Sequence, residues 1–90
     1  MESHYFFPPA SAYRLNRCLF WLKSDDVFRG RYLEDPQAAM ARAGLDAETQ
    51  AALSASDRQR LIALGAHPYL VFMAELRLTM ERDPAALEYF

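Results

Sequence analysis

Residues 64–73 read LGAHPYLVFM, and this stretch decides the fold. Gly65 is a natural left-handed end for one helix, and Pro68 begins the next, because a first-turn residue does not need its N–H. The new helix opens with two turns that carry no charged side chain. A small domain must bury such a helix on nearly every side, so the stretch predicts a dense helical core or a surface that meets a partner.

The composition indicates a single globular domain that is rich in apolar side chains. Of the 90 residues, 52% are hydrophobic and 13% are aromatic, and the net charge is -2 with basic and acidic residues well mixed. That excludes a disordered chain and provides no basic stripe for nucleic acid. No apolar run approaches the roughly 20 residues of a membrane span. One cysteine, Cys18, allows no internal disulfide, and we expect a cytoplasmic protein that binds neither nucleic acid nor membrane.

Start and stop signals predict an all-α fold, a compact irregular multi-helical domain of about five to six short helices with an extended N-terminal arm. The expected helices cover 12–23, 26–33, 36 to the stop at Gly44, 47–53, 57–64 and 69–82, and a last turn is expected to begin at 83–84 and end at 89–90. Ser11 is the expected N-cap of the first helix and Asp35 that of the third. Ser56 followed by Gln59 fits a capping box for the fifth.

The N-terminal arm covers residues 1–10, and a single helical domain is expected over 11–90. Two consecutive prolines block helix formation in the arm. His4, Tyr5, Phe6 and Phe7 precede them, and burying each ring would contribute roughly 1.5–3 kcal/mol. The arm therefore either folds back on its own domain or grips another chain, and both interpretations stay open.

The titratable residues do not form a catalytic or metal-binding set. The chain has two histidines, His4 in the arm and His67 at the kink, and a facial iron site would need both to converge with an acid. Cys18 lies on the apolar stripe of the first helix, where a core role explains it. We expect no catalytic residue, metal or cofactor on this chain. The His67 ring could bind the free carbonyls at the end of the preceding helix, or it could point into a cleft shared with a partner.

An ordered series of short motifs runs from the first helix onward. It consists of Leu15-Asn16, 28–33, Asp35-Pro36 with Met40, Gly44-Leu45, Asp57 and 65–72. Over roughly residues 12–75 this series resembles the LigA-like small (α) subunit family of protocatechuate 4,5-dioxygenase, an extradiol ring-cleaving enzyme. The resemblance implies a helical subunit without iron. It would pack on a larger β subunit that holds non-haem Fe(II) through two histidines and a glutamate, and it would cap that active-site cleft. Well-known members have longer N- and C-terminal extensions, and part of their pocket lining comes from C-terminal segments, so no pocket residue is assigned here from those segments.

The leading hypothesis is a non-catalytic small subunit of an extradiol dioxygenase that acts on a catechol-type aromatic acid. Its substrate-pocket residues are expected to be His67 and Tyr69, and its interface residues Phe6, Phe7, Trp21 and Phe72. Fe(II) is expected on the partner β subunit. The alternative is a stand-alone helical docking module, as a monomer or a homodimer, that recruits another enzyme or a peptide. A third hypothesis is a small-molecule binder that uses the kink at His67.

Overall fold

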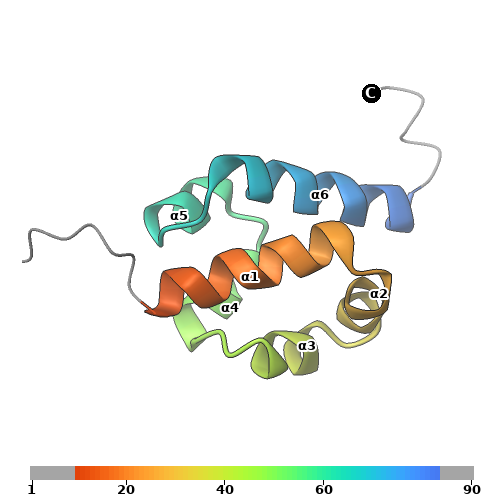
Figure 1. Cartoon of the computed structure of the whole chain (residues 1–90), viewed down its shortest axis with the longest axis horizontal. Coiled ribbons are helices and arrows are strands. Elements are labelled where there is room, and N and C mark those ends of the chain that lie inside the picture. Colours follow the sequence, from red (N-terminus) through yellow and green to blue (C-terminus); the bar gives the residue numbers. More distant parts are fainter. Residues whose placement is uncertain (1–9, 84–90) are drawn as a thin grey trace, which may run out of the picture.

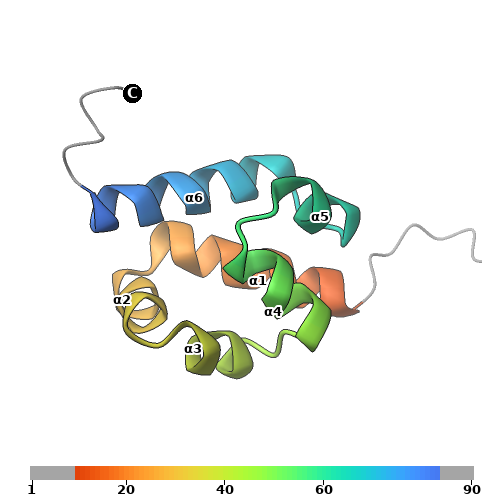
Figure 2. The ribbon, with the colours of Figure 1, turned by 180° about the vertical axis from the view of Figure 1, so that it is seen from behind.

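The computed structural model describes residues 10–83, which form six α-helices and no strand. The helices are α1 (Ala10–Ser24), α2 (Asp26–Glu34), α3 (Pro36–Arg42), α4 (Ala47–Ser54), α5 (Arg58–Ala63) and α6 (Pro68–Arg82). α1 and α6 lie side by side and run in the same direction, and α2, α3 and α4 cover the other side of α1 (Figures 1 and 2). The predicted all-α, irregular multi-helical domain is confirmed. The aromatic residues of the arm and the predicted last turn from 84 onward lie outside the described residues.

Four of the short helices begin at an aspartate that caps them. The carboxylate of Asp25 accepts hydrogen bonds from the amides of Val27 and Phe28 at 2.9 and 3.1 Å. The other three caps are Asp35 for α3, Asp46 for α4 and Asp57 for α5, each accepting from an amide three residues on at 2.8–3.2 Å. Each cap satisfies amides that a helix start leaves without partners. The predicted starts of the second, third and fourth helices, at 26, 36 and 47, are therefore correct.

Two predicted N-caps are wrong. Ser11 lies inside α1, which already begins at Ala10. Ser56 ends α4 instead of starting α5, because its φ of 53° is in the left-handed region. Its amide donates to the carbonyl of Leu53 at 3.1 Å, and that of Asp57 donates to the carbonyl of Ala52 at 3.0 Å. These two bonds form a Schellman motif, in which glycine is the usual residue at the position of Ser56.

Ser56→Gly should therefore stabilise the domain by about 0.5–1 kcal/mol, because glycine adopts a positive φ without the steric penalty of a side chain. Urea unfolding followed by circular dichroism measures the change. Ser54→Gly is the matched control in the helical last turn of α4, where glycine should lower the free energy of unfolding instead. A loss of stability in Ser56→Gly would contradict the strain assigned to this position.

The core forms where α1 packs against α6 and against the short helices. The buried apolar side chains include Ala12, Leu15, Cys18, Leu19 and Leu22 of α1, Val71, Ala74 and Leu78 of α6, and Tyr32, Met40, Leu45, Leu53 and Leu61 between them. Cys18 is fully buried, and burial raises the pKa of its thiol to about 12. The thiol is therefore protonated at neutral pH and acts as a small core side chain, as the sequence predicts.

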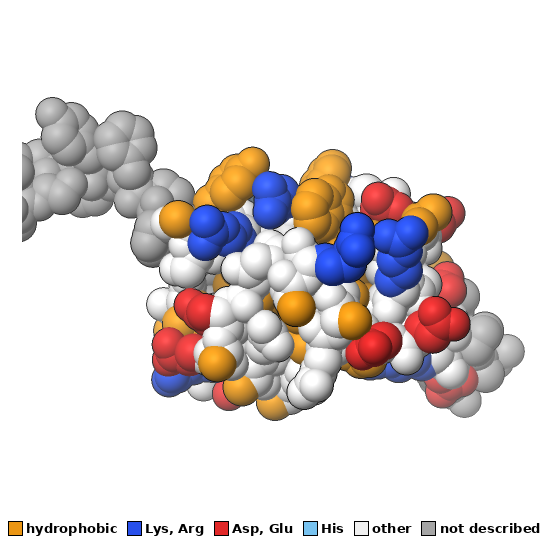
Figure 3. Space-filling model, turned by 90° about the horizontal axis from the view of Figure 1, so that it is seen from below, with side chains coloured by type: hydrophobic (Ala, Val, Ile, Leu, Met, Phe, Trp, Pro, Cys, Tyr) orange, Lys and Arg blue, Asp and Glu red, His pale blue; other side chains and the backbone are white. Residues whose placement is uncertain are grey.

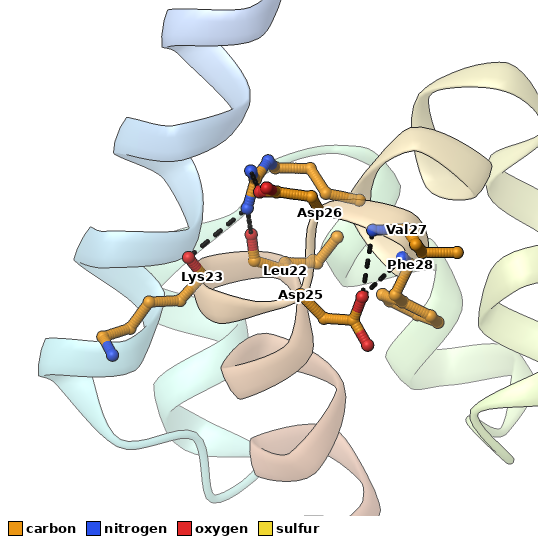
Figure 4. A network of polar contacts seen from close by, with 7 residues as sticks. Leu22, Lys23, Asp25, Asp26, Val27 and Phe28 are labelled. Atoms are coloured by element: carbon orange, nitrogen blue, oxygen red, sulfur yellow. Dashed lines mark hydrogen bonds and ion pairs between the residues drawn. The ribbon is translucent and has the colours of Figure 1, made fainter.

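A buried arginine closes the corner between α1 and α2. Arg29 is 3% exposed, and its Nη1 donates to the carbonyl oxygens of Leu22 and Lys23 at 2.9 and 3.3 Å. Its Nη2 pairs with the carboxylate of Asp26. Figure 4 shows the two carbonyls at the end of α1 and the Asp25 cap that starts α2 beside them. The guanidinium satisfies carbonyls that the end of a helix leaves free.

Arg29→Met should lower the free energy of unfolding by about 2–3 kcal/mol, because it leaves these carbonyl oxygens buried without a donor. Thermal and urea unfolding measure the loss. Arg31→Met is the control on the same helix, since Arg31 is exposed and its replacement should change stability by less than about 0.5 kcal/mol. Equal effects of the two substitutions would show that the buried network does not stabilise the corner.

Candidate functional site: the loop before α6 and its exposed face

The loop from Leu64 to His67 is tied to α1 by one side chain. Asn16 accepts a hydrogen bond from the backbone amide of His67 at 2.7 Å through Oδ1. Its Nδ2 donates to the carbonyl of Gly65 at 3.0 Å and to that of Ala12 at 3.0 Å. The side-chain amide of Asn16 thus bonds backbone groups on both sides of the kink. These bonds fix the start of α6 relative to α1.

Gly65 allows the loop to approach α1 closely. Its φ is +107°, in the left-handed region, and its amide and that of Ala66 complete a Schellman motif at the end of α5. A Cβ placed on Gly65 would lie 2.6 Å from the Cβ of Ala12, which is fully buried. Both the backbone conformation and the packing therefore require glycine here.

His67 caps the helix that follows it. Its Nδ1 accepts a hydrogen bond from the amide of Tyr69 at 3.1 Å, so the cap needs a neutral ring with Nδ1 unprotonated. The predicted bond from the ring to the end of the preceding helix is wrong, because backbone amides already occupy those carbonyls: Ala66 donates to Leu61 and Gly65 to Ile62. The His67 side chain is exposed, with its Nε2 not used in the cap.

α6 carries an apolar stripe that the core does not cover. Val71, Ala74 and Leu78 are its buried residues. Leu70 is partly buried and packs against the core. We call the other large apolar side chains of the helix, Tyr69, Phe72, Met73, Leu76 and Met80, the outer α6 stripe. Tyr69 is 55% and Phe72 51% exposed, and the other three are half-buried. Helical spacing places all five on one side of α6. The expectation that α6 is buried on nearly every side is therefore met only on its core side.

The structure divides the predicted site residues between two places. His67, Tyr69 and Phe72 lie together in the first turns of α6. Trp21 lies on α1, where its ring packs against that of Phe28 of α2 with centroids 5.3 Å apart. The start of α6 and α2 are at opposite ends of the molecule (Figures 1 and 2). Phe6 and Phe7 are outside the described residues. Sequence reasoning missed the ties made by Asn16 and Arg29, because their backbone partners follow no local motif.

Two further findings concern the described part of the chain. Between residues 10 and 83, no three side chains of His, Cys, Asp or Glu are grouped so that they could hold a metal ion. None of the six helices has the length and apolar character needed to cross a membrane.

The fold and the outer α6 stripe define a small helical domain with an exposed apolar surface of the kind that meets a protein partner. Residues 15–86 match the model of the LigA family, described as the LigA subunit of the aromatic-ring-opening dioxygenase LigAB. The chain belongs to this family, which confirms the resemblance seen in the sequence. Neither the curated proteins nor the solved structures contain a significant match.

Proposed function

We propose that this chain is the non-catalytic small subunit of an extradiol dioxygenase and that it caps the active site of a larger β subunit. The observation that carries the proposal is the outer α6 stripe. It begins two residues after His67, in two helical turns that carry no charged side chain. The family match supports the coarser statement that the chain is a LigA-type subunit. In this proposal Fe(II) is bound by the β subunit, and this chain supplies no ligand to it.

The stripe has the chemistry that a cap over a reaction site requires. Apolar side chains such as Phe72 exclude water from the cleft they cover, and water exclusion strengthens the electrostatic interactions inside. The hydroxyl of Tyr69 and the Nε2 of His67 are polar groups at the same end of α6, and they would hydrogen-bond a catechol-type aromatic acid such as protocatechuate. The Asn16 tie holds the backbone at the start of α6 in place before binding, which reduces the entropy lost on association.

The remaining interface residues extend this proposal. Phe6 and Phe7 would add aromatic contacts with the β subunit from the arm. Trp21 would contact a partner through the α1–α2 surface at the other end of the molecule. Aromatic side chains are enriched at interface cores.

The test is to purify the chain alone, a LigAB-type catalytic subunit alone, and both together. We expect one stoichiometric complex in size-exclusion chromatography with light scattering, and ring opening of protocatechuate in the presence of Fe(II) only in samples with the catalytic subunit. Ring opening by the chain alone would overturn the non-catalytic role. Failure of the two chains to associate would overturn the capping role.

The alternative is a homodimeric docking module that pairs through α6. One observation favours it: residues 69, 73, 76 and 80 follow a four-three-four spacing, which is the spacing of apolar residues in a seam between two helices. Analytical sedimentation of the purified chain distinguishes the small-subunit role from the homodimeric docking module. A monomer at micromolar concentration fits the small-subunit role, and a stable dimer lost in Met73→Glu would support the alternative.

A further inference from the structure

The outward side of α1 carries a row of stacked aromatic and cationic side chains. The guanidinium carbon of Arg17 lies 5.5 Å from the ring centroid of Tyr13 and 4.8 Å from that of Trp21. The three residues are four positions apart and therefore follow one line along the helix. The row continues onto α2 through the contact of Trp21 with Phe28. Cation–π stacking holds these groups in place while leaving Tyr13 60% exposed.

A hollow of about 250 Å³ lies at the α2 end of this row. It is lined by Trp21, Asp25, Val27, Phe28, Arg31 and Arg42. Val27 is 64% exposed, so an apolar side chain is left in water beside the two rings. The lining of the hollow thus combines three apolar side chains with two guanidinium groups and one carboxylate. Figure 3 shows hydrophobic side chains alternating with Lys and Arg side chains along the upper edge of the molecule.

Arginines collect around the end of α3, next to the hollow. The Nη2 of Arg17 donates to the carbonyl of Ala43 at 3.4 Å, and the side chain of Arg14 lies over Gly44. The ion pairs formed between described residues involve Arg29, Arg58 and Arg60, so Arg31 and Arg42 take part in none of them. Because the whole chain has a net charge of -2, this positive charge is a local feature of one surface.

We propose that this α1–α2 surface binds an acidic segment of a protein partner that also carries an aromatic side chain. Guanidinium groups bind carboxylates through paired hydrogen bonds, which assigns the acidic residues of the segment to Arg31 and Arg42. An aromatic side chain of the segment would stack on Trp21 and Phe28. Trp, Tyr and Arg are also the residues that most often dominate binding energy at protein interfaces.

Charge favours a protein segment over a nucleic acid as the occupant. Asp25 lines the same hollow, and its carboxylate would repel a continuous run of phosphates. A peptide can place its carboxylates beside the arginines and an uncharged side chain beside Asp25. The surface lies at the other end of the molecule from the start of α6 (Figures 1 and 2). The inference therefore deepens only the interface role proposed for Trp21, and the peptide experiment can fail or succeed without deciding whether α6 caps an active site.

The single tryptophan makes the test specific, because Trp21 gives the only indole signal of the chain. The probe is a capped Glu-Glu-Phe-Glu-Glu peptide, added at low ionic strength to the full chain labelled with ¹⁵N. We expect saturable shifts of the Trp21 indole and of the amides of 25–31, with those of α6 unchanged. A capped Gln-Gln-Phe-Gln-Gln peptide should bind at least ~10-fold more weakly, because the charge-assisted bonds are lost. Added salt should weaken the binding of the acidic peptide, because it screens the interaction between opposite charges.

Two charge-reversed variants provide the matched controls. Arg31→Glu/Arg42→Glu should abolish the shifts, whereas Arg58→Glu/Arg60→Glu, with the same change in net charge, should retain them. Circular dichroism confirms that both variants are helical. The inference is overturned if the acidic peptide causes no saturable shift of the Trp21 indole, or if the uncharged peptide binds equally well. It is also overturned if the two variants lose the shifts to the same extent. Tighter binding of a single-stranded oligonucleotide to the same residues would also overturn it.

Discussion

Gly65→Ala should lower the free energy of unfolding by about 3 kcal/mol. A side chain at φ +107° incurs roughly 1–2 kcal/mol of backbone strain. The new Cβ would also lie 2.6 Å from that of Ala12, and overpacking of this kind adds roughly 1–3 kcal/mol. Ala12 is short and rigid and cannot rotate away. Since a domain of this size is stable by only about 5–13 kcal/mol, urea unfolding followed by circular dichroism will show the loss clearly.

Gly30→Ala is the matched control for this substitution. Gly30 lies inside α2, and a Cβ added there has nothing within 4 Å. Alanine should therefore stabilise the domain by about 0.5–1 kcal/mol through its higher helix propensity. The double variant Gly65→Ala/Ala12→Gly should remove the clash between the two Cβ atoms, but the backbone strain at position 65 should remain. If Gly65→Ala and Gly30→Ala change the free energy of unfolding in the same direction, the claim that the close packing of the loop on α1 requires glycine at position 65 would be contradicted.

Phe72→Ser should weaken the complex with the catalytic subunit by at least ~30-fold, the range of a central aromatic contact at an interface. Phe72 is half exposed in the chain on its own, so the substitution should leave the free energy of unfolding within about 0.5 kcal/mol of the original value. The two effects separate a binding role from a folding role. Isothermal titration of the catalytic subunit measures the affinity, and urea unfolding measures the stability.

Phe20→Ser is the closest control the chain offers. Phe20 lies on α1 and is 49% exposed, against 51% for Phe72, so the two substitutions remove the same kind of side chain at the same exposure. We expect Phe20→Ser to change the affinity by less than ~3-fold, as most residues outside an interface centre do. Equal losses in both variants would show that the outer α6 stripe is not the docking surface.

Most helix positions could be predicted because their signals are local. Asp35-Pro36 and His67-Pro68 mark helix starts, and Gly44 marks a helix end, each through a backbone requirement that one or two residues reveal. Ser56 was assigned wrongly for a physical reason. Ser56 and Asp57 are both good N-caps, and only the bonds that end α4 decide between them.

The exposed face of α6 could not be predicted, because the helix is apolar on two sides. Periodicity selects a buried face only when the other face is polar. In the structure the smaller residues Val71 and Ala74 pack toward the core, while the larger Tyr69 and Phe72 face outward. The Asn16 tie reaches residues 49 and 51 positions away, and no local pattern contains a contact of that range.

The most direct test of the capping role is the rate of protocatechuate ring opening by the catalytic subunit as this chain is titrated in. The predicted result is a rate that rises and saturates, with a half-saturating concentration at least ~30-fold higher for Phe72→Ser than for the unaltered chain, matching its loss of affinity. A ring-opening rate that is the same with and without the chain would contradict the capping role.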